Sequence, residues 1–218
     1  SHKLIEEFMI TANVAAAIEL EKKSKSFLYR VHAEPPSKNL ESLRSFLKPL
    51  GYNLSKGQVL TPLNFNQILK KSKNSDVYEA VTQMILRSQS QAVYADENIG
   101  HFGLSLRRYC HFTSPIRRYS DLIVHRALIS ANFLGEGGFL NKDIDIASIA
   151  EHTSMTERRA SKAERQSTDR FAAAYLSDKI GEKFKGRVNG VAKFGLFISL
   201  DRIGADGLIP IRSLPDDF

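Results

Sequence analysis

The apolar pattern of this sequence changes near residue 180, and that change limits what the chain can fold into. Before it, apolar residues recur at steps of three and four, which places them on one face of a helix. From Phe184 to Leu200 apolar and polar residues alternate between glycines, as is typical of a twisted antiparallel sheet. We therefore expect an α+β chain, with a mostly helical domain over residues 1–180 and a short antiparallel β domain over residues 181–218.

The helical part is expected to hold six helices joined by short extended pieces. Capping residues set several limits: Thr61-Pro62 is typical of a helix start, and the cluster Gly135–Gly138 of a break. The expected helices cover residues 4–23, 37–51, 61 onward, 76–88, 114–133 and 143–179. The expected strand-like pieces cover residues 27–32, 92–94 and 102–104.

Composition narrows the class of protein. The 218 residues carry a net charge of +7, which favours a polyanionic partner, with nucleic acid the first candidate. No apolar run of about 18 residues is present, so we expect no membrane-spanning helix. The single cysteine, Cys110, excludes a disulfide scaffold and fits a reducing compartment such as the cytoplasm. Because the chain begins at Ser1 without an initiator methionine, we expect it to be a piece of a longer protein.

The segment that follows Tyr109 contains the most informative charge pattern. With Ser114 as N-cap and Pro115 as the first helical residue, Arg117 falls in the first turn of a helix, where the helix dipole disfavours a cation. A cation beside exposed backbone donors suits a phosphate ligand. The alternative is that Arg117 forms a purely structural ion pair with Asp121, four residues later.

This segment also carries a family resemblance. The run Thr113-Ser114-Pro115-Ile116-Arg117-Arg118-Tyr119-Ser120-Asp121 resembles the signature of the RNase II/RNase R exoribonucleases, whose catalytic module is the RNB domain. Three further motifs of that family are similar, in the same order: E-E-x-M-x-x-A-N at residues 6–13, R-V-H-x-x-P at 30–35 and H-F-G-L at 101–104. The resemblance covers residues 1–180 and is strongest to the bacterial RNase R branch.

The resemblance implies processive 3′-to-5′ hydrolysis of single-stranded RNA to nucleoside 5′-monophosphates, with divalent metal ions. It assigns Arg117 to the scissile phosphate, where a guanidinium stabilises charge on the phosphoryl oxygens. It also places a set of further residues along the RNA, namely Glu6, Asn13, Arg118, Tyr119 and Glu164. Ordinary alternatives stay open: a helix-start carboxylate for Glu6, a packing hydrogen bond for Asn13 and a solvated charge for Glu164.

The family's metal ligands are not recognisable in this sequence. In the family they are an aspartate cluster of the D-x-D-D type, which lies upstream of all the motifs matched here. Asp143 with Asp145, and Asp216 with Asp217, are the nearest substitutes, and neither pair has a convincing context. We therefore expect Mg²⁺ in the intact enzyme to be held by residues outside this chain, and the chain alone to be inactive.

The C-terminal segment resembles the opening strands of an S1-type RNA-binding domain, an OB-fold barrel that binds single strands. The resemblance rests on residues 186–188, 193–198 and 207–211. It implies RNA contacts by five side chains: Lys185, Arg187, Lys193, Phe194 and Phe197. Alternation places the two phenylalanines on opposite faces, and a bulge at Gly195 would bring them together. A core role for both rings, and plain solvation of the cations, are the alternatives.

The C-terminal segment contains three of the five strands of such a barrel. Because an incomplete barrel leaves unpaired strand edges, we expect this segment to be poorly ordered or to be completed by a neighbouring molecule.

Three functions remain open at this stage. The first is a fragment of an exoribonuclease, and the second is a module that binds single-stranded RNA without cleaving it. The third is a helical interaction scaffold whose charge only confers solubility. Salt-dependent RNA binding separates the second from the third, and cleavage restored by the missing upstream segment identifies the first.

Overall fold

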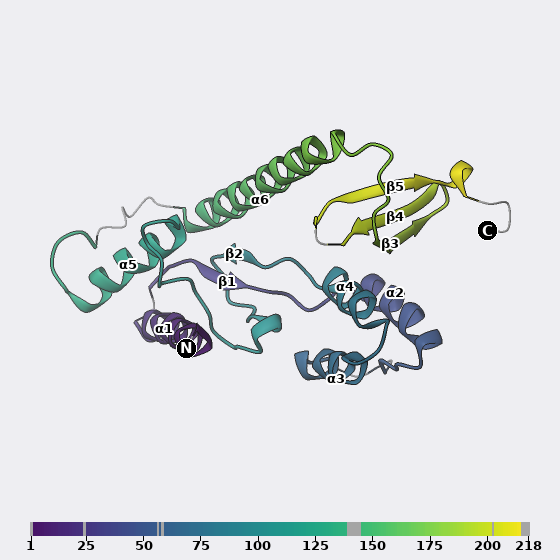
Figure 1. Cartoon of the computed structure of the whole chain (residues 1–218). Coiled ribbons are helices and arrows are strands. Elements are labelled where there is room, and N and C mark those ends of the chain that lie inside the picture. Colours follow the sequence, from purple (N-terminus) through teal and green to yellow (C-terminus); the bar gives the residue numbers. More distant parts are fainter. Residues whose placement is uncertain are drawn as a thin grey trace. The chain divides into compact units, whose positions relative to one another are not determined.

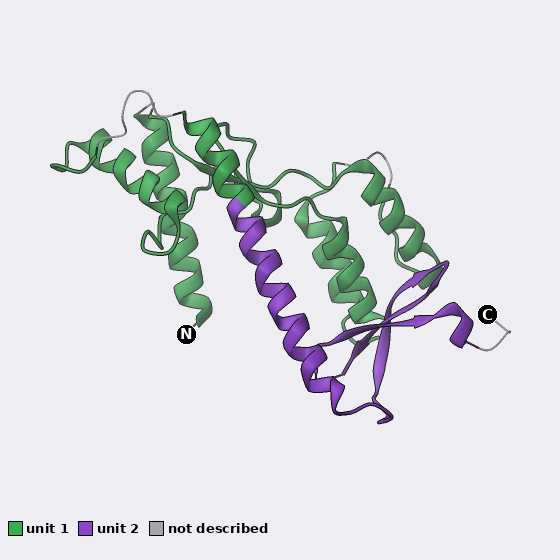
Figure 2. Cartoon of the chain, turned by 90° about the horizontal axis from the view of Figure 1, so that it is seen from above, with its two compact units in different colours: residues 1–155 green, residues 156–218 purple. Residues whose placement is uncertain are grey.

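The computed structural model describes residues 2–23, 25–55, 57, 59–138, 145–201 and 203–214 (Figure 1). The chain divides into two compact units, residues 1–155 and 156–218 (Figure 2). The division falls inside the long helix α6 (Ile146–Ser177), whose buried residues all lie in its first turns, before residue 155. The domain boundary predicted near residue 180 stays a prediction.

Unit 1 is mostly helical, as the sequence predicts. Its helices are α1 (His2–Lys22), α2 (Ser37–Leu47), α3 (Pro62–Ser72), α4 (Tyr78–Ser88), α5 (Tyr119–Asn132) and the start of α6. Short 3₁₀ helices cover Lys48–Leu50 and Phe102–Leu104. The strands β1 (Tyr29–Val31) and β2 (Val93–Ala95) pair antiparallel, with Arg30 opposite Tyr94. In the described part of the chain, no helix is long and apolar enough to cross a membrane.

Two elements differ from the sequence prediction. Residues 102–104 form a 3₁₀ helix instead of a strand. The reason is a tight loop in which His101 pairs with Leu106, while the backbone N–H of Phe102 donates to the carbonyl of His32. The helix predicted from Ser114 begins only at Tyr119. By contrast, α3 begins where Thr61-Pro62 predicts, with a capping box between Thr61 and Asn64.

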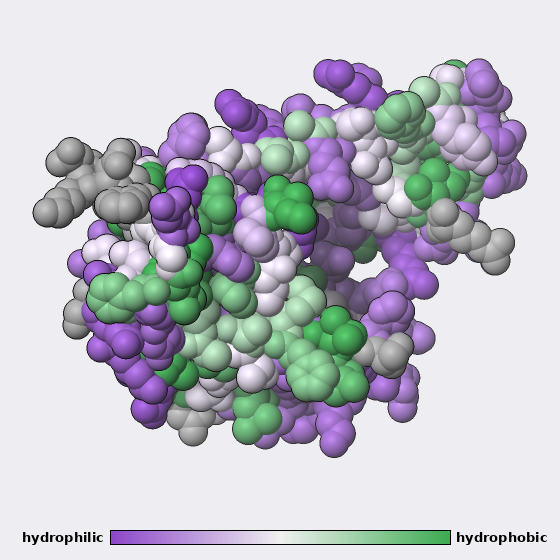
Figure 3. Space-filling model, turned by 90° about the vertical axis from the view of Figure 1, so that its left-hand side faces the viewer, coloured by the Kyte–Doolittle hydropathy of each residue, from purple (hydrophilic) through white to green (hydrophobic). Residues whose placement is uncertain are grey.

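The core of unit 1 is divided among three clusters of buried apolar side chains. The first joins α1 to α5 around Cys110 and Phe27, both of which are essentially inaccessible. The second holds α2, α3 and α4 together, and the third joins the strands to α5 and α6 through Leu28 and Ile123. Hydrophobic residues also reach the surface (Figure 3), and on α1 Leu4 and Phe8 are more than half exposed. The α1–α5 cluster supports the loop that precedes α5.

Unit 2 carries the predicted antiparallel segment. Its strands β3 (Gly186–Ala192), β4 (Gly195–Leu200) and β5 (Asp206–Pro210) form one sheet in sequence order, followed by a 3₁₀ turn over Ile211–Ser213. The bulge that the sequence analysis placed at Gly195 is wrong, because the register shifts between Val188 and Gly190 of β3 instead. The described strands form one three-stranded antiparallel sheet, and its completion by a neighbouring molecule stays a prediction.

The sheet geometry of unit 2 requires a glycine at position 195. Its φ is +156°, and a Cβ there would lie 2.2 Å from the carbonyl oxygen of Ile209 on β5. We expect Gly195→Ala to separate β4 from β5 and to destabilise the sheet by about 2 kcal/mol or more. Hydrogen–deuterium exchange of the strand amides measures this loss as faster exchange in both strands.

The matched control is Gly207→Ala on β5, where nothing lies within 4 Å of the added carbon. We expect its strand amides to exchange at nearly the original rate. Equal effects of the two substitutions would contradict the steric argument.

Candidate active site

The candidate site is the turn between Thr113 and Arg118, directly before α5. The backbone N–H groups of Arg117 and Arg118 both donate to the carbonyl of Ser114, at 3.3 and 3.1 Å. Arg118 is then extended, with φ −127° and ψ 117°, and forms the N-cap of α5. Arg117 therefore lies in a separate turn and not in the first turn of the helix, which corrects the predicted placement.

Asp121 explains where the helix begins. It is the third residue of α5, the position where the helix dipole favours a carboxylate. Its side chain is fully buried, and Oδ1 accepts hydrogen bonds from the N–H of Ser114 and from Nη2 of Arg118, both at 2.8 Å. Oδ2 accepts a third bond from the hydroxyl of Ser120 at 3.1 Å. These donors and the Arg118 cation compensate for burying the charge.

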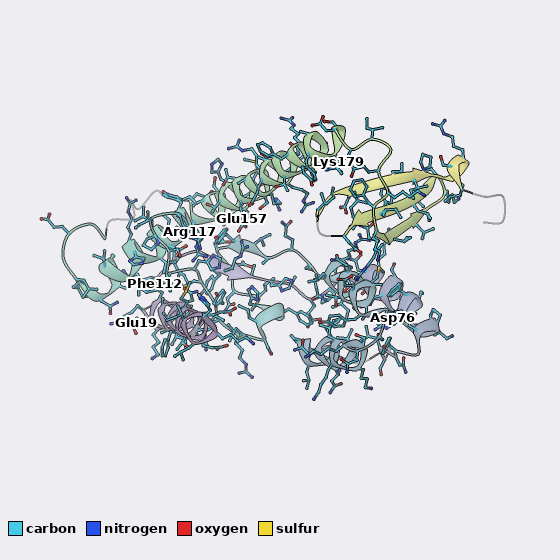
Figure 4. The ribbon with its side chains drawn as sticks, viewed as in Figure 1. Glu19, Asp76, Phe112, Arg117, Glu157 and Lys179 are labelled. Carbon is cyan, nitrogen blue, oxygen red and sulfur yellow. The ribbon has the colours of Figure 1, made fainter. Side chains whose placement is uncertain are left out.

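The two neighbouring arginines thus have different surroundings. The side chain of Arg118 is 21% exposed and forms an ion pair with Asp121. Arg117, which is labelled in Figure 4, is exposed, and no described residue forms an ion pair with it. The alternative in which Arg117 and Asp121 form a structural pair is wrong, because Arg118 occupies that carboxylate. The structure leaves one guanidinium of this turn available to a ligand.

Asn13 holds the segment that leads into this turn. Its Nδ2 donates to the hydroxyl of Tyr109 at 3.0 Å, and its Oδ1 accepts from the N–H of Phe112 at 2.9 Å. The thiol of Cys110 donates to its backbone carbonyl at 3.3 Å. Asn13 is only 3% exposed, so the geometry favours the packing alternative over a direct contact with RNA.

Side chains of α5 and β2 fix the same segment. His125 of α5 bonds through Nε2 to the carbonyl of Phe112 at 2.9 Å, and the two rings stack with centroids 4.3 Å apart. Nδ1 of His111 lies 2.9 Å from the hydroxyl of Tyr94 on β2. The guanidinium of Arg30 lies 4.6 Å from the centre of the Tyr94 ring. Residues 109–112 are therefore anchored to α1, α5 and β2 before the turn begins.

Burial keeps the ionisable groups of this segment uncharged. Burial, with the nearby Arg118 and Arg30 acting in the same direction, lowers the pKa of His111 to about 3. Burial also lowers the pKa of His101 to about 4, aided by His32. The pKa of the Cys110 thiol is raised to about 12, mainly by burial. A neutral thiol in the core is not a nucleophile, so Cys110 is a small apolar residue.

The remaining predicted contacts lie on the surface of one unit or the other. Glu6 on α1 is exposed, and Tyr119, the first residue of α5, is 51% exposed. Of the contacts predicted in unit 2, Glu164, Lys185, Arg187 and Lys193 are exposed. Their contacts with RNA stay predictions.

Phe194 and Phe197 lie together on the sheet of unit 2. Phe194 belongs to the two-residue turn between β3 and β4, so strand alternation does not apply to it. The two rings meet edge to face with centroids 5.9 Å apart, and they are 59% and 41% exposed. The turn, and not a bulge, brings the rings together, and their exposure disfavours the core alternative.

Sequence reasoning missed the central role of Asp121, although a signal was present. The apolar stripe of α5 runs through Val124 and Ala127, and an aspartate three residues before Val124 falls on the same buried face. A carboxylate at such a position predicts a buried charge with dedicated partners.

The described residues include no group of three or more histidine, cysteine, aspartate or glutamate side chains able to hold a metal ion. Asp145 instead caps α6, accepting hydrogen bonds from the N–H groups of Ala147 and Ser148. Asp143, Asp216 and Asp217 lie outside the described residues. The residues present therefore do not fit the two-metal site of the exoribonucleases.

Unit 1 presents the exposed Arg117 in the turn before α5, and unit 2 presents two exposed aromatic rings on a small antiparallel sheet. Comparison with known proteins defines the class: residues 1–133 match the RNB domain family, and residues 177–218 match the S1 RNA binding domain. The chain belongs to the RNB domain family.

The relatives identify the branch within that class. Ribonuclease R of Vibrio cholerae is 42% identical to this chain over 228 residues, and the match covers all of this chain and 28% of that protein. Ribonuclease R of Escherichia coli is 39% identical over 227 residues, and this match also covers all of this chain and 28% of that protein. The structure of Mycoplasma genitalium RNase R in complex with ribose methylated single-stranded RNA superimposes with a TM-score of 0.88 at 33% identity, covering all of this chain and 35% of that one. The predicted resemblance to the RNase R branch is confirmed, and the chain spans 28% of the length of those two curated relatives.

The buried histidine predicts a pH dependence of stability. The unfolded chain protonates His111 below about pH 6.5, whereas the folded chain resists protonation until about pH 3. Because the unfolded state binds the extra proton, the free energy of unfolding falls as the pH drops from about 6.5 towards 3. Urea unfolding followed by circular dichroism, at pH 7 and pH 5, measures this slope.

His111→Gln, which keeps a hydrogen-bonding side chain opposite Tyr94, is expected to weaken the pH dependence. The same substitution at the exposed His152 on α6 serves as the control and should leave the slope unchanged. An identical slope in all three proteins would refute the role of His111.

Proposed function

We propose that this chain forms part of the catalytic region of a 3′-to-5′ exoribonuclease that hydrolyses RNA to nucleoside 5′-monophosphates. The observation that carries the proposal is the exposed Arg117 guanidinium, held in a turn whose other cation is already neutralised by Asp121. The match to the RNB family and the likeness to Ribonuclease R support the reaction class.

The chemistry that this turn supplies is electrostatic. Hydrolysis of a phosphodiester builds negative charge on the nonbridging oxygens, and a guanidinium donates to two of them at once. A cation fixed in advance stabilises this charge at the transition state more than in the ground state. We assign that role to the exposed Arg117, and we propose that Tyr119, which is also exposed, lines the path of the strand.

The metal ions of such a reaction need carboxylate ligands besides the residues described here. Since the described residues hold no suitable cluster, no step through a metal is derived from them. We propose that Mg²⁺ serves the intact enzyme and that its carboxylate ligands come from outside the chain described here, in a protein that acts in the cytoplasm.

Single-stranded RNA is the proposed partner. The exposed pair of Phe194 and Phe197 offers a stacking surface, and Lys193 is an exposed cation in the same turn as Phe194. Lys185 and Arg187 provide further exposed cations towards the other end of β3. Structures of Mycoplasma genitalium RNase R are known in complex with ribose methylated single-stranded RNA and with double-stranded RNA. For the present protein we propose the single-stranded partner.

Arg117→Ala in the full-length protein that contains this chain tests the catalytic role. We expect kcat to fall by about 10² or more, because a transition-state contact is lost. RNA affinity, measured without divalent metal, should fall by less than about tenfold, because a single exposed ion pair contributes about 1 kcal/mol.

Arg107→Ala, which removes another exposed arginine of unit 1, is the charge control and should leave kcat nearly unchanged. If Arg117→Ala reduces affinity in proportion to rate, Arg117 anchors RNA and does not act in the chemical step.

A second candidate function is an RNA-binding module without catalysis, which the lack of a metal cluster among the described residues favours for the isolated chain. Yeast Ssd1, a pseudonuclease, has a similar fold, with a TM-score of 0.75 at 21% identity.

We expect the purified 218-residue chain to bind a single-stranded oligonucleotide in a salt-dependent manner. It should release no mononucleotides in Mg²⁺. Fluorescence anisotropy across a salt series and chromatography of the incubated RNA measure both quantities. Mg²⁺-dependent release by this chain alone would refute the proposed origin of the metal ligands, and no affinity at low salt would favour the scaffold hypothesis.

A further inference from the structure

We propose that Asp121 is a positioning residue, whose buried carboxylate holds the turn over residues 113–118 and thereby places the guanidinium of Arg117. This inference rests on the proposed function, since it concerns how the catalytic arginine is presented. Asp121 has a positioning role only, and contacts neither RNA nor the reacting atoms.

The contacts of the carboxylate span the whole turn. One oxygen, Oδ1, accepts from the backbone of Ser114 at the start and from the side chain of Arg118 at the end, each at 2.8 Å. Arg117 lies between these two fixed points. Because Asp121 is fully buried, water has no access to replace either bond.

The same carboxylate separates the functions of the two arginines. Two adjacent cations repel each other, and either is able to bind a phosphate. Pairing with Asp121 holds Arg118 against the protein at 21% exposure, which leaves Arg117 as the cation of the turn that faces solvent. Without the negative charge, Arg118 becomes a half-buried cation with no counterion and is expected to leave its place.

The surrounding structure does not depend on this carboxylate alone. Residues 109–112 are anchored separately by Asn13 of α1 and by His125 of α5. The apolar face of α5, including Ile123 and Val124, remains buried whatever occupies position 121. Loss of the charge is therefore expected to release the turn while the helices stay packed.

Asp121→Asn in the full-length protein tests the proposal, because asparagine keeps the size of the side chain and removes its charge. We expect kcat to fall at least tenfold, while the dissociation constant for single-stranded RNA without divalent metal changes by less than threefold. The matched control is Asp145→Asn, which alters a carboxylate that caps α6 and lies outside the turn. It should leave kcat unchanged.

A double-mutant cycle separates positioning from a general structural role. If Asp121 acts through Arg117, Asp121→Asn causes little further loss of kcat in a protein that already carries Arg117→Ala. If the two losses multiply, Asp121 acts by some other route and the inference is overturned. No loss of kcat from Arg117→Ala alone would instead remove the proposed function, so the two failures are distinguishable.

Asp121→Glu keeps the cycle informative if the asparagine variant does not fold. Glutamate retains the charge that neutralises Arg118 but displaces the carboxylate by one methylene. We expect a smaller fall in kcat that again disappears in the Arg117→Ala background. A glutamate variant with unchanged kcat and a disordered turn, judged by rapid amide exchange at residues 114–118, would also overturn the inference.

Discussion

The arrangement of the candidate site depends on one buried charge. Removing a carboxylate from water costs several kcal/mol unless donors and a counterion replace the solvent. The backbone of Ser114, the hydroxyl of Ser120 and the guanidinium of Arg118 provide that replacement around Asp121. The pairing requires the chain to turn before α5 begins, and this turn leaves the neighbouring arginine in solvent.

The loop before this turn follows the same physical rule. It is irregular, so its polar groups cannot be satisfied by a helix or a sheet ladder. Asn13 of α1, Tyr94 of β2 and His125 of α5 satisfy them, and Cys110 and Phe112 pack in the α1–α5 cluster. A surface group is thereby supported by a buried polar network, which is how irregular segments acquire a defined position.

A shared fold does not by itself establish an activity. The yeast pseudonuclease Ssd1 has a similar fold, and the present chain spans 28% of curated Ribonuclease R relatives. The reaction proposed here therefore requires groups besides those of the fold, above all carboxylates that bind metal ions. The described residues contribute an electrostatic component, Arg117, and a surface suited to single strands.

Local patterns determined the secondary structure and the family. Apolar periodicity predicted the helices and the C-terminal strands, because it reports on residues within a few positions of one another, and the motif around Arg117 indicated the RNB class. Only the tertiary structure decided which arginine Asp121 binds, and that Asn13 is buried against Tyr109, 96 residues away. It also decided that a turn, not a bulge, joins Phe194 to Phe197. Burial and hydrogen-bond partners depend on segments distant in the chain, and for that reason no local pattern specifies them.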